Sequence, residues 1–176
     1  MRAVLLIGLA ATALAGCEAM QSMWGGGVKA TANLQPTKGS TVRGTVNFEQ
    51  RGEKVRVAAN ISGLRPNGEF GFHVHEAGDC SSGDGMSAKG HFNPFGKPHG
   101  AHGTAERHAG DLPSLKSDAN GNASLTTDVD TISVGSGPAN IVGRGLIVHV
   151  QPDDFKTQPT GNAGARSACA VIQRLS

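Results

Sequence analysis

The stretch from Phe72 to Asp111, FHVHEAGDCSSGDGMSAKGHFNPFGKPHGAHGTAERHAGD, starts as a strand and then loses any regular period. It contains six of the seven histidines, and His149 lies alone far downstream. Imidazole is the commonest metal ligand in proteins. Long aperiodic segments are unusual inside a compact domain and are usually functional. We therefore expect this stretch to leave a β-framework as a long loop and to carry a metal site.

Alternating apolar residues predict the framework. The runs at 28–34, 42–48 and 55–61 each place apolar side chains on one face, which predicts an antiparallel sheet with one wet side. With 26 glycines and few helical runs, the chain is predicted to be all-β. Further strands are expected at 70–75, 123–127, 129–134, 146–150 and 169–175. The total of about eight strands fits an antiparallel sandwich or flattened barrel with two long functional loops, at 76–118 and 151–167.

Strand phase assigns the histidines to a face. The apolar residues at 70, 72 and 74 point to the core, so His73 and His75 point to the outer face. Residues two apart lie about 6.6 Å apart along a strand, and their imidazoles can converge on one metal. His149 also lies on the outer face of its strand. A His-x-His motif alone fits exposed histidines that bind nothing equally well.

The loop contains a second set of ligands. His91, His99, His108 and Asp111 are separated by eight, nine and three residues. Three imidazoles and one carboxylate form a closed tetrahedral set suited to zinc. His102 could replace His99, but the spacing favours His99, and we expect His102 to be a solvated loop histidine.

The strand histidines form a set that lacks one ligand. His73, His75 and His149 come from two strands, and an all-imidazole site suits copper. His91 could complete this set if each of its two ring nitrogens binds a metal.

The N-terminal segment is predicted to be an export signal. In residues 1–17, Arg2 is followed by an apolar run at 3–15 that is too short to span a bilayer. Cys17 stands where a bacterial lipoprotein is cleaved and lipidated; the alternative is an ordinary secretory signal with an incidental cysteine. Residues 18–27 form a flexible tether, and the domain occupies 28–176. We expect an exported, periplasmic or cell-envelope protein, lipid-anchored to a bacterial membrane.

Charge and cysteine content limit the partners and the redox state. The formal net charge is +2, which gives no indication of nucleic-acid binding. Loss of Arg2 with the signal leaves 15 basic residues against 14 acidic ones, so attraction of an anion would depend on local charge placement. Cys80 and Cys169 remain in the domain, and two cysteines in an exported domain usually pair. A pair of free thiols is the alternative.

Five motifs in family order resemble the copper–zinc superoxide dismutases, in their bacterial exported form. The resemblance covers about residues 28–176 and implies a Greek-key β-barrel, dismutation of superoxide, copper and zinc as cofactors, and a homodimer as in many members. The motifs are Gly71-Phe72-His73-Val74-His75-Glu76, Gly90-His91-Phe92-Asn93-Pro94, His108-Ala109-Gly110-Asp111-Leu112, Val148-His149 and Thr160-Gly161-Asn162-Ala163-Gly164-Ala165-Arg166.

The resemblance also implies a role for each matching residue. Copper would be bound by His73, His75, His91 and His149, and zinc by His91, His99, His108 and Asp111, with His91 as the bridge. Asp153 would accept hydrogen bonds from His73 and His99. Cys80 and Cys169 would form the disulfide. Arg166 would dock superoxide at the mouth of the copper channel, and His91 would donate a proton during turnover.

Two other functions remain open from the sequence. An exported copper- and zinc-buffering protein could use the same fold without useful turnover, and a plain β-sandwich adhesion module would bind no metal. The loop from His149 to Arg166 is shorter than in animal relatives and carries Lys156 among few acids. The family's steering pattern therefore does not transfer in detail, and the length of the Cys80 loop leaves the dimer contact open.

Overall fold

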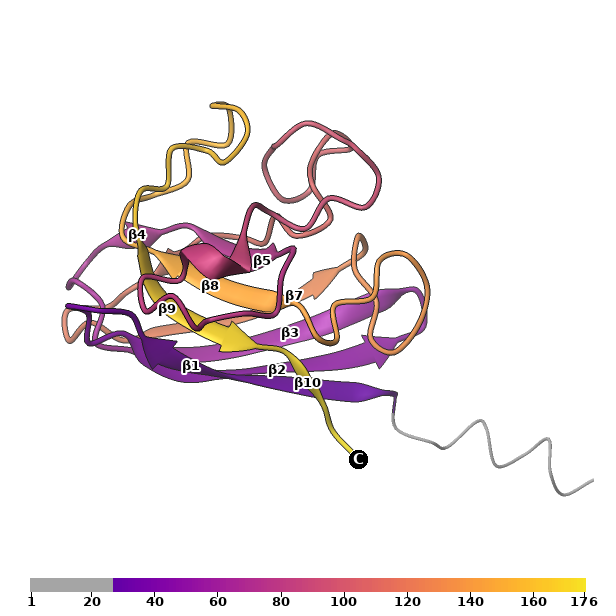
Figure 1. Ribbon diagram of the computed structural model, residues 1–176, viewed down its shortest axis with the longest axis horizontal. Coiled ribbons are helices and arrows are strands. Elements are labelled where there is room, and N and C mark those ends of the chain that lie inside the picture. The colour runs from indigo at the N-terminus through magenta and orange to yellow at the C-terminus, as the bar shows by residue number, and fades with distance from the viewer. Residues whose placement is uncertain (1–26) are drawn as a thin grey trace, which may run out of the picture.

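An antiparallel β-sheet curled into a half-barrel forms the body of the molecule (Figure 1). The computed structural model describes residues 27–176, so the predicted signal, the lipidated Cys17 and residues 18–26 of the tether lie outside the described residues. Within the described residues, no helix is both long enough and apolar enough to cross a membrane. The strands are β1 (Lys29–Pro36), β2 (Arg43–Arg51), β3 (Lys54–Ser62), β4 (Glu69–Phe70), β5 (Phe72–His75), β6 (Leu115–Lys116), β7 (Ala123–Val129), β8 (Gly145–His149), β9 (Arg166–Val171) and β10 (Gln173–Arg174).

The strand order requires three crossovers between the two edges of the sheet. The main sheet runs β5-β8-β9-β1-β2-β3-β7, β10 also pairs with β1, and β4 pairs with β6 in a separate ribbon. The chain passes from β3 to the opposite edge at β5, returns to β3 with β7, and crosses again to β8. This antiparallel arrangement confirms the predicted all-β fold.

The strand boundaries differ from the predictions in three places. The predicted strand at 70–75 is divided between β4 and β5 at Gly71. A Cβ at Gly71 would lie 2.8 Å from the Ala163 Cβ and 3.0 Å from the His73 Cε1, so the close packing there requires glycine. The predicted strand at 129–134 is absent, because β7 ends at Val129 and only Ser133 forms an isolated bridge, with Asn140. The last strand starts earlier than predicted, at Arg166, and is interrupted at Ile172.

The core lies on the concave face of the sheet, where the alternating apolar residues meet. Val46, Val57 and Phe72 are completely buried, and they belong to one continuous apolar cluster. In β1 and β3, buried residues alternate with exposed or half-buried ones, as the period of two predicts.

The outer face of β5 and β8 is not wet. Every residue of both strands is buried, and His73 and His75 have 0% exposure. Two long loops, which follow β5 and β8, project on the same side of the sheet in Figure 1. The expectation of an exposed outer face is therefore wrong at these two strands, because the loops cover the histidines that the strands present.

Candidate metal centre

Backbone pairing brings the long loop against β5. Val74 donates its N–H to the Gly110 carbonyl at 2.9 Å, and Phe92 donates its N–H to the Val74 carbonyl at 2.8 Å. As a result, His75 forms a bridge with His91, and His73 with Asp111. Residues distant in sequence are thus placed beside the strand histidines by main-chain geometry.

Four buried histidines form the first cluster. His73, His75, His91 and His149 each offer a ring nitrogen, and these nitrogens lie within 4.8 Å of one another. β5 supplies two of the rings, and β8 supplies His149. The cluster unites the strand set predicted from the sequence with His91 from the loop.

Each ring of the first cluster has one nitrogen held by a protein oxygen. His73 Nε2 is 2.7 Å from Asp153 Oδ2, and His91 Nδ1 is 2.9 Å from Asp111 Oδ1. His75 Nδ1 is 2.8 Å from the Lys89 carbonyl, and His149 Nδ1 is 3.1 Å from the Gly164 carbonyl. The rings are therefore fixed in orientation by groups outside the cluster.

The other nitrogen of each ring is buried and has no hydrogen-bond partner among the described residues. These atoms are His73 Nδ1, His75 Nε2, His91 Nε2 and His149 Nε2. Buried polar atoms without partners are rare in proteins, because desolvation is costly. Four such lone pairs at one point fit a metal that accepts imidazole, and an all-imidazole set suits copper.

The second cluster consists of His91, His99, His108 and Asp111, whose ligand atoms also lie within 4.8 Å of one another. Asp111 Oδ2 is 3.0 Å from His99 Nδ1, and Asp111 Oδ1 is 3.4 Å from His108 Nδ1. His99 Nδ1 nevertheless makes no well-aligned hydrogen bond. Two groups this close that do not bond each other fit a common third atom, and this donor set fits zinc.

Asp153 links the two clusters. Its two carboxylate oxygens lie 2.7 Å from His73 Nε2 and 2.9 Å from His99 Nε2, and it also accepts the Phe155 N–H at 2.7 Å. A Cβ at Gly161 would lie 1.8 Å from Asp153 Oδ1, so only glycine fits there. The predicted contacts of Asp153 with one histidine of each set are therefore present.

The surroundings of the histidines shift their pKa values in opposite directions. Burial and neighbouring imidazoles lower the pKa of His91 to about 4 and of His149 to about 3, and the same causes lower the pKa of His75. Burial also opposes protonation of His99, but the adjacent carboxylates of Asp111 and Asp153 outweigh burial and raise its pKa to about 9. Hydrogen bonds from the histidines lower the pKa of Asp111 against the effect of burial.

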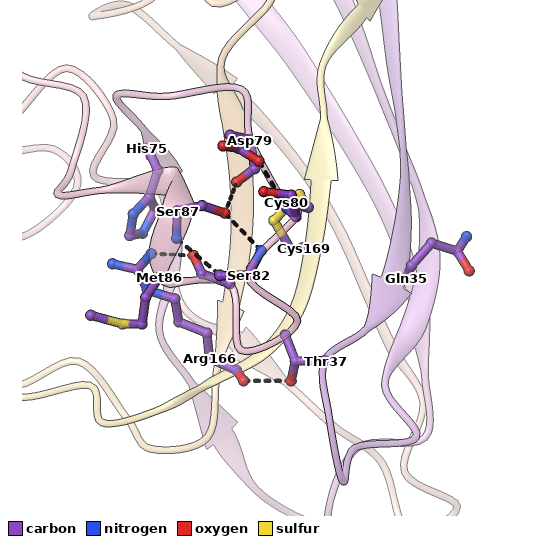
Figure 2. Close-up of a disulfide and its surroundings, with 12 residues drawn as sticks. Gln35, Thr37, His75, Asp79, Cys80, Ser82, Met86, Ser87, Arg166 and Cys169 are labelled. Carbon is purple, nitrogen blue, oxygen red and sulfur yellow. Dashed lines mark hydrogen bonds between the residues drawn. A yellow bond between two sulfur atoms is a disulfide. The ribbon is translucent and has the colours of Figure 1, made fainter.

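Arg166 lies beside the first cluster, held by the loop that carries Cys80 (Figure 2). Its guanidinium donates to the Gly85 and Lys89 carbonyls, and the Lys89 carbonyl also binds His75 Nδ1. Its side chain is only half-buried, and burial lowers its pKa. A cation so placed, next to a histidine of the cluster, can dock a small anion.

The disulfide between Cys80 and Cys169 joins that loop, residues 76–90 and hereafter the disulfide loop, to β9, with an S–S distance of 2.01 Å. This confirms the predicted pairing and excludes the free-thiol alternative. The loop is also braced internally, because Ser87 Oγ donates to the Asp79 carbonyl at 2.9 Å and the Ser87 N–H donates to Ser82 Oγ at 3.0 Å (Figure 2). The disulfide and these bonds fix the carbonyls that hold Arg166.

His102 belongs to neither cluster. It is half-buried, with its Nδ1 shielded from solvent, so it is less solvated than predicted. Sequence reasoning missed the carbonyls of Lys89, Gly85 and Gly164, which orient His75, Arg166 and His149. A carbonyl is present at every residue, so no side-chain pattern could have identified them.

Comparison with known proteins gives consistent similarities. A family model described as copper/zinc superoxide dismutase matches residues 42–172. A copper–zinc superoxide dismutase of Paramecium bursaria Chlorella virus 1 is 45% identical over 137 residues, which cover 74% of this chain and 72% of the relative. One from Aquifex aeolicus is 39% identical over 150 residues, covering 83% and 87%. A crystal structure of a protein described as the clock protein EA4 superposes with a TM-score of 0.76 and 44% identity, covering 84% of this chain and 94% of that one.

Proposed function

This chain belongs to the copper/zinc superoxide dismutase family, and we propose which of its residues carry the activity. The activity is the conversion of superoxide into oxygen and hydrogen peroxide, with copper and zinc as cofactors. The family and its activity leave open which side chains of this chain act, where the protein resides and how it assembles.

We assign copper to His73, His75, His91 and His149, and zinc to His91, His99, His108 and Asp111. The observation that carries the copper assignment is the set of four buried, unpartnered nitrogens that face one another while the second nitrogen of each ring is held by an oxygen. Bound copper supplies the one-electron redox change that dismutation needs, and bound zinc supplies a fixed positive charge beside the shared ring.

Three groups of the chain serve the reaction in this assignment. Arg166 attracts superoxide and positions it beside His75, because the Lys89 carbonyl holds the Arg166 and His75 side chains next to each other. His91 Nε2 can carry the proton that the product peroxide requires, while its Nδ1 stays on the Asp111 side. Asp153 keeps the His73 and His99 rings in place throughout.

The assignment is tested by metal analysis and superoxide decay on the purified protein. We expect about one copper and one zinc per chain and a catalysed decay of superoxide. The variant Arg166→Gln should keep both metals and lose most of the activity. The matched control is His102→Gln, because His102 lies outside both clusters. Loss of metal in His102→Gln, or full activity in Arg166→Gln, would refute the assignment.

We also propose that the mature protein begins at a lipidated Cys17 and acts in the periplasm or cell envelope on a membrane anchor. The apolar run at 3–15, which ends in Leu14-Ala15 and is followed by Gly16-Cys17, supports this proposal. Cells grown with radioactive palmitate should label the protein, and the labelled protein should be found in the membrane fraction. The variant Cys17→Ala should be unlabelled. A labelled Cys17→Ala protein or an unlabelled native chain would contradict the anchor.

We further propose a homodimer, on the analogy of family members. The expected result is a detergent-solubilised mass of two chains in sedimentation equilibrium. A single-chain mass over the micromolar range would rule it out.

A further inference from the structure

A second concave site lies on the other side of Arg166, between the β1–β2 loop and the start of β9. Its volume is about 440 Å³, within the range of small-molecule sites. No residue of the two metal clusters contributes to it. The lining residues are Thr37, Lys38, Gly39, Ser40, Thr41, Val42, Arg65, Phe70, Val150, Gln151, Ala165, Arg166 and Ser167.

The charged residues that line this cavity are all cations. Lys38, Arg65 and Arg166 line it, and none of its lining residues is acidic. Among the described residues, Lys38 and Arg65 form no ion pair. The negative charge of Asp84, on the disulfide loop, raises the pKa of Arg166, but Asp84 does not line the cavity. Cations gathered in a hollow without counter-ions focus positive potential into it.

The wall of the cavity is fixed by hydrogen bonds to β9 and to the disulfide loop. Thr37 Oγ1 donates to the Arg166 carbonyl at 2.7 Å (Figure 2), and the Thr37 N–H donates to the Ser167 carbonyl at 3.1 Å. The Lys38 N–H donates to the Gly83 carbonyl at 2.8 Å. The loop that carries Lys38 therefore has a defined position relative to β9.

Arg65 is positioned by the Phe70 ring. Its guanidinium carbon is 5.3 Å from the centre of the Phe70 ring, which is 3% exposed and therefore fixed. The planar fork of arginine matches the oxygens of phosphate. Ser40 Oγ accepts the Val42 N–H at 3.1 Å and keeps its own hydrogen free to donate, whereas the other lining hydroxyls already donate to backbone carbonyls. Val42 and Phe70 leave an apolar strip beside these donors.

We propose that this cavity binds a phosphate-type oxyanion, either free phosphate or the head of a small phosphate monoester. Lys38 and Arg65 supply the charge, and the Ser40 hydroxyl adds a neutral donor. The site is separate from the docking of superoxide beside the first metal cluster and shares only Arg166 with it.

Binding can be followed on the full-length, metal-loaded protein in its diamagnetic, reduced form. Inorganic phosphate is titrated at constant ionic strength against chloride, and amide chemical shifts are recorded. We expect saturable shifts at residues 38–42 and 65 with phosphate and none with chloride. The double variant Lys38→Gln/Arg65→Gln should weaken binding at least tenfold. The charge-matched control Lys54→Gln/Arg174→Gln, at exposed positions outside the lining, should bind normally.

Glycerol 3-phosphate distinguishes the source of the anion. Tighter binding than that of phosphate assigns the cavity to monoesters, and equal binding assigns it to the free anion. Saturable shifts confined to His75 and its surroundings, abolished by Arg166→Gln and unchanged in the Lys38/Arg65 double variant, would overturn the proposal. Absence of saturable shifts in the folded native protein would overturn it as well.

Discussion

His91 is the residue on which the two clusters depend. It belongs to both sets of four ligands, and its two nitrogens face different partners: Nδ1 lies 2.9 Å from Asp111, and Nε2 is unpartnered among the other rings of the first cluster. A histidine can serve two metals only if nothing else occupies either nitrogen. In His91, Nε2 has no protein partner and Nδ1 contacts only Asp111 and His108, which belong to the second cluster, so each nitrogen faces one ligand set.

Replacement of His91 should therefore perturb both metals. In His91→Asn, we expect copper and zinc affinities each to fall by roughly 10–100-fold or more, since outer-shell changes alone have effects of that size. In His99→Asn, zinc should be lost first and copper largely kept. Metal content after dialysis against a weak chelator measures both. Loss of zinc alone in both variants would refute the shared role of His91.

The metal-free protein should be most stable near pH 6.5. The pKa of His99 in the folded state, about 9, is above its unfolded value, so its stabilisation is present below pH 6.5 and is lost as the pH rises toward 9. The folded pKa values of His91 and His149, about 4 and 3, are below the unfolded value, so stability also declines as the pH falls from 6.5 toward 4.

Urea midpoints of the metal-free protein at pH 4.5, 6.5 and 9 test this expectation. The variant His99→Gln should remove much of the loss between pH 6.5 and 9 and leave the acid side unchanged. A midpoint that rises steadily from pH 6.5 to 9 in the native sequence would contradict the assigned direction.

At the scale of elements, the strands supply rings and the loops supply their supports. β5 and β8 present His73, His75 and His149, while loop residues complete both clusters and fix ring orientation. The disulfide loop carries the Lys89 carbonyl, which holds His75 and Arg166 together. Closing that loop against β9 therefore positions the Arg166 side chain, to which we assign the docking of the anion.

Removal of the disulfide should affect stability and activity together. In Cys80→Ser/Cys169→Ser, loss of the cross-link over 89 residues should lower the free energy of unfolding by about 4–5 kcal/mol in the chain-entropy model. Turnover should fall even where the protein is fully folded and metal-loaded, because Arg166 loses its fixed carbonyls. Denaturant unfolding and superoxide decay measure the two effects. Unchanged turnover would show that Arg166 is positioned without the loop.

At the scale of the whole molecule, charge is nearly balanced. The formal net charge is +2, so in the proposed assignment attraction of superoxide would arise from local placement of Arg166 and of the cations beside it rather than from overall charge. Exposed ion pairs elsewhere, such as Arg56 with Asp128 at 2.9 Å, neutralise much of the remaining surface.

The rate of superoxide consumption should consequently fall with ionic strength. The Debye length shrinks from about 30 Å at 0.01 M to about 8 Å at 0.15 M salt, which screens attraction toward Arg166. Arg166→Gln should lower kcat/KM about tenfold and flatten the salt dependence. Arg56→Gln is the control, because its charge is paired with Asp128. A rate that increases with salt would indicate net repulsion of the anion.

The sequence by itself determined the chemistry of the site. Ligand identity and spacing separated His91, His99, His108 and Asp111 from the strand histidines, because donor type and loop spacing are local properties of the chain. The alternation of apolar residues predicted the first three strands for the same reason, since side-chain direction in a strand has a period of two. It failed at 129–134, where no strand partner is available to the segment.

Only the tertiary structure decided how the site is buried and how its side chains are oriented. Phase placed His73 and His75 on an outer face, but burial of that face came from loops whose path has no period. The carbonyls of Lys89, Gly85 and Gly164 gained their roles through loop closure, and the cavity beside Lys38 and Arg65 exists because separate segments meet at β9. These features depend on distances between residues remote in sequence, which side-chain pattern alone does not encode.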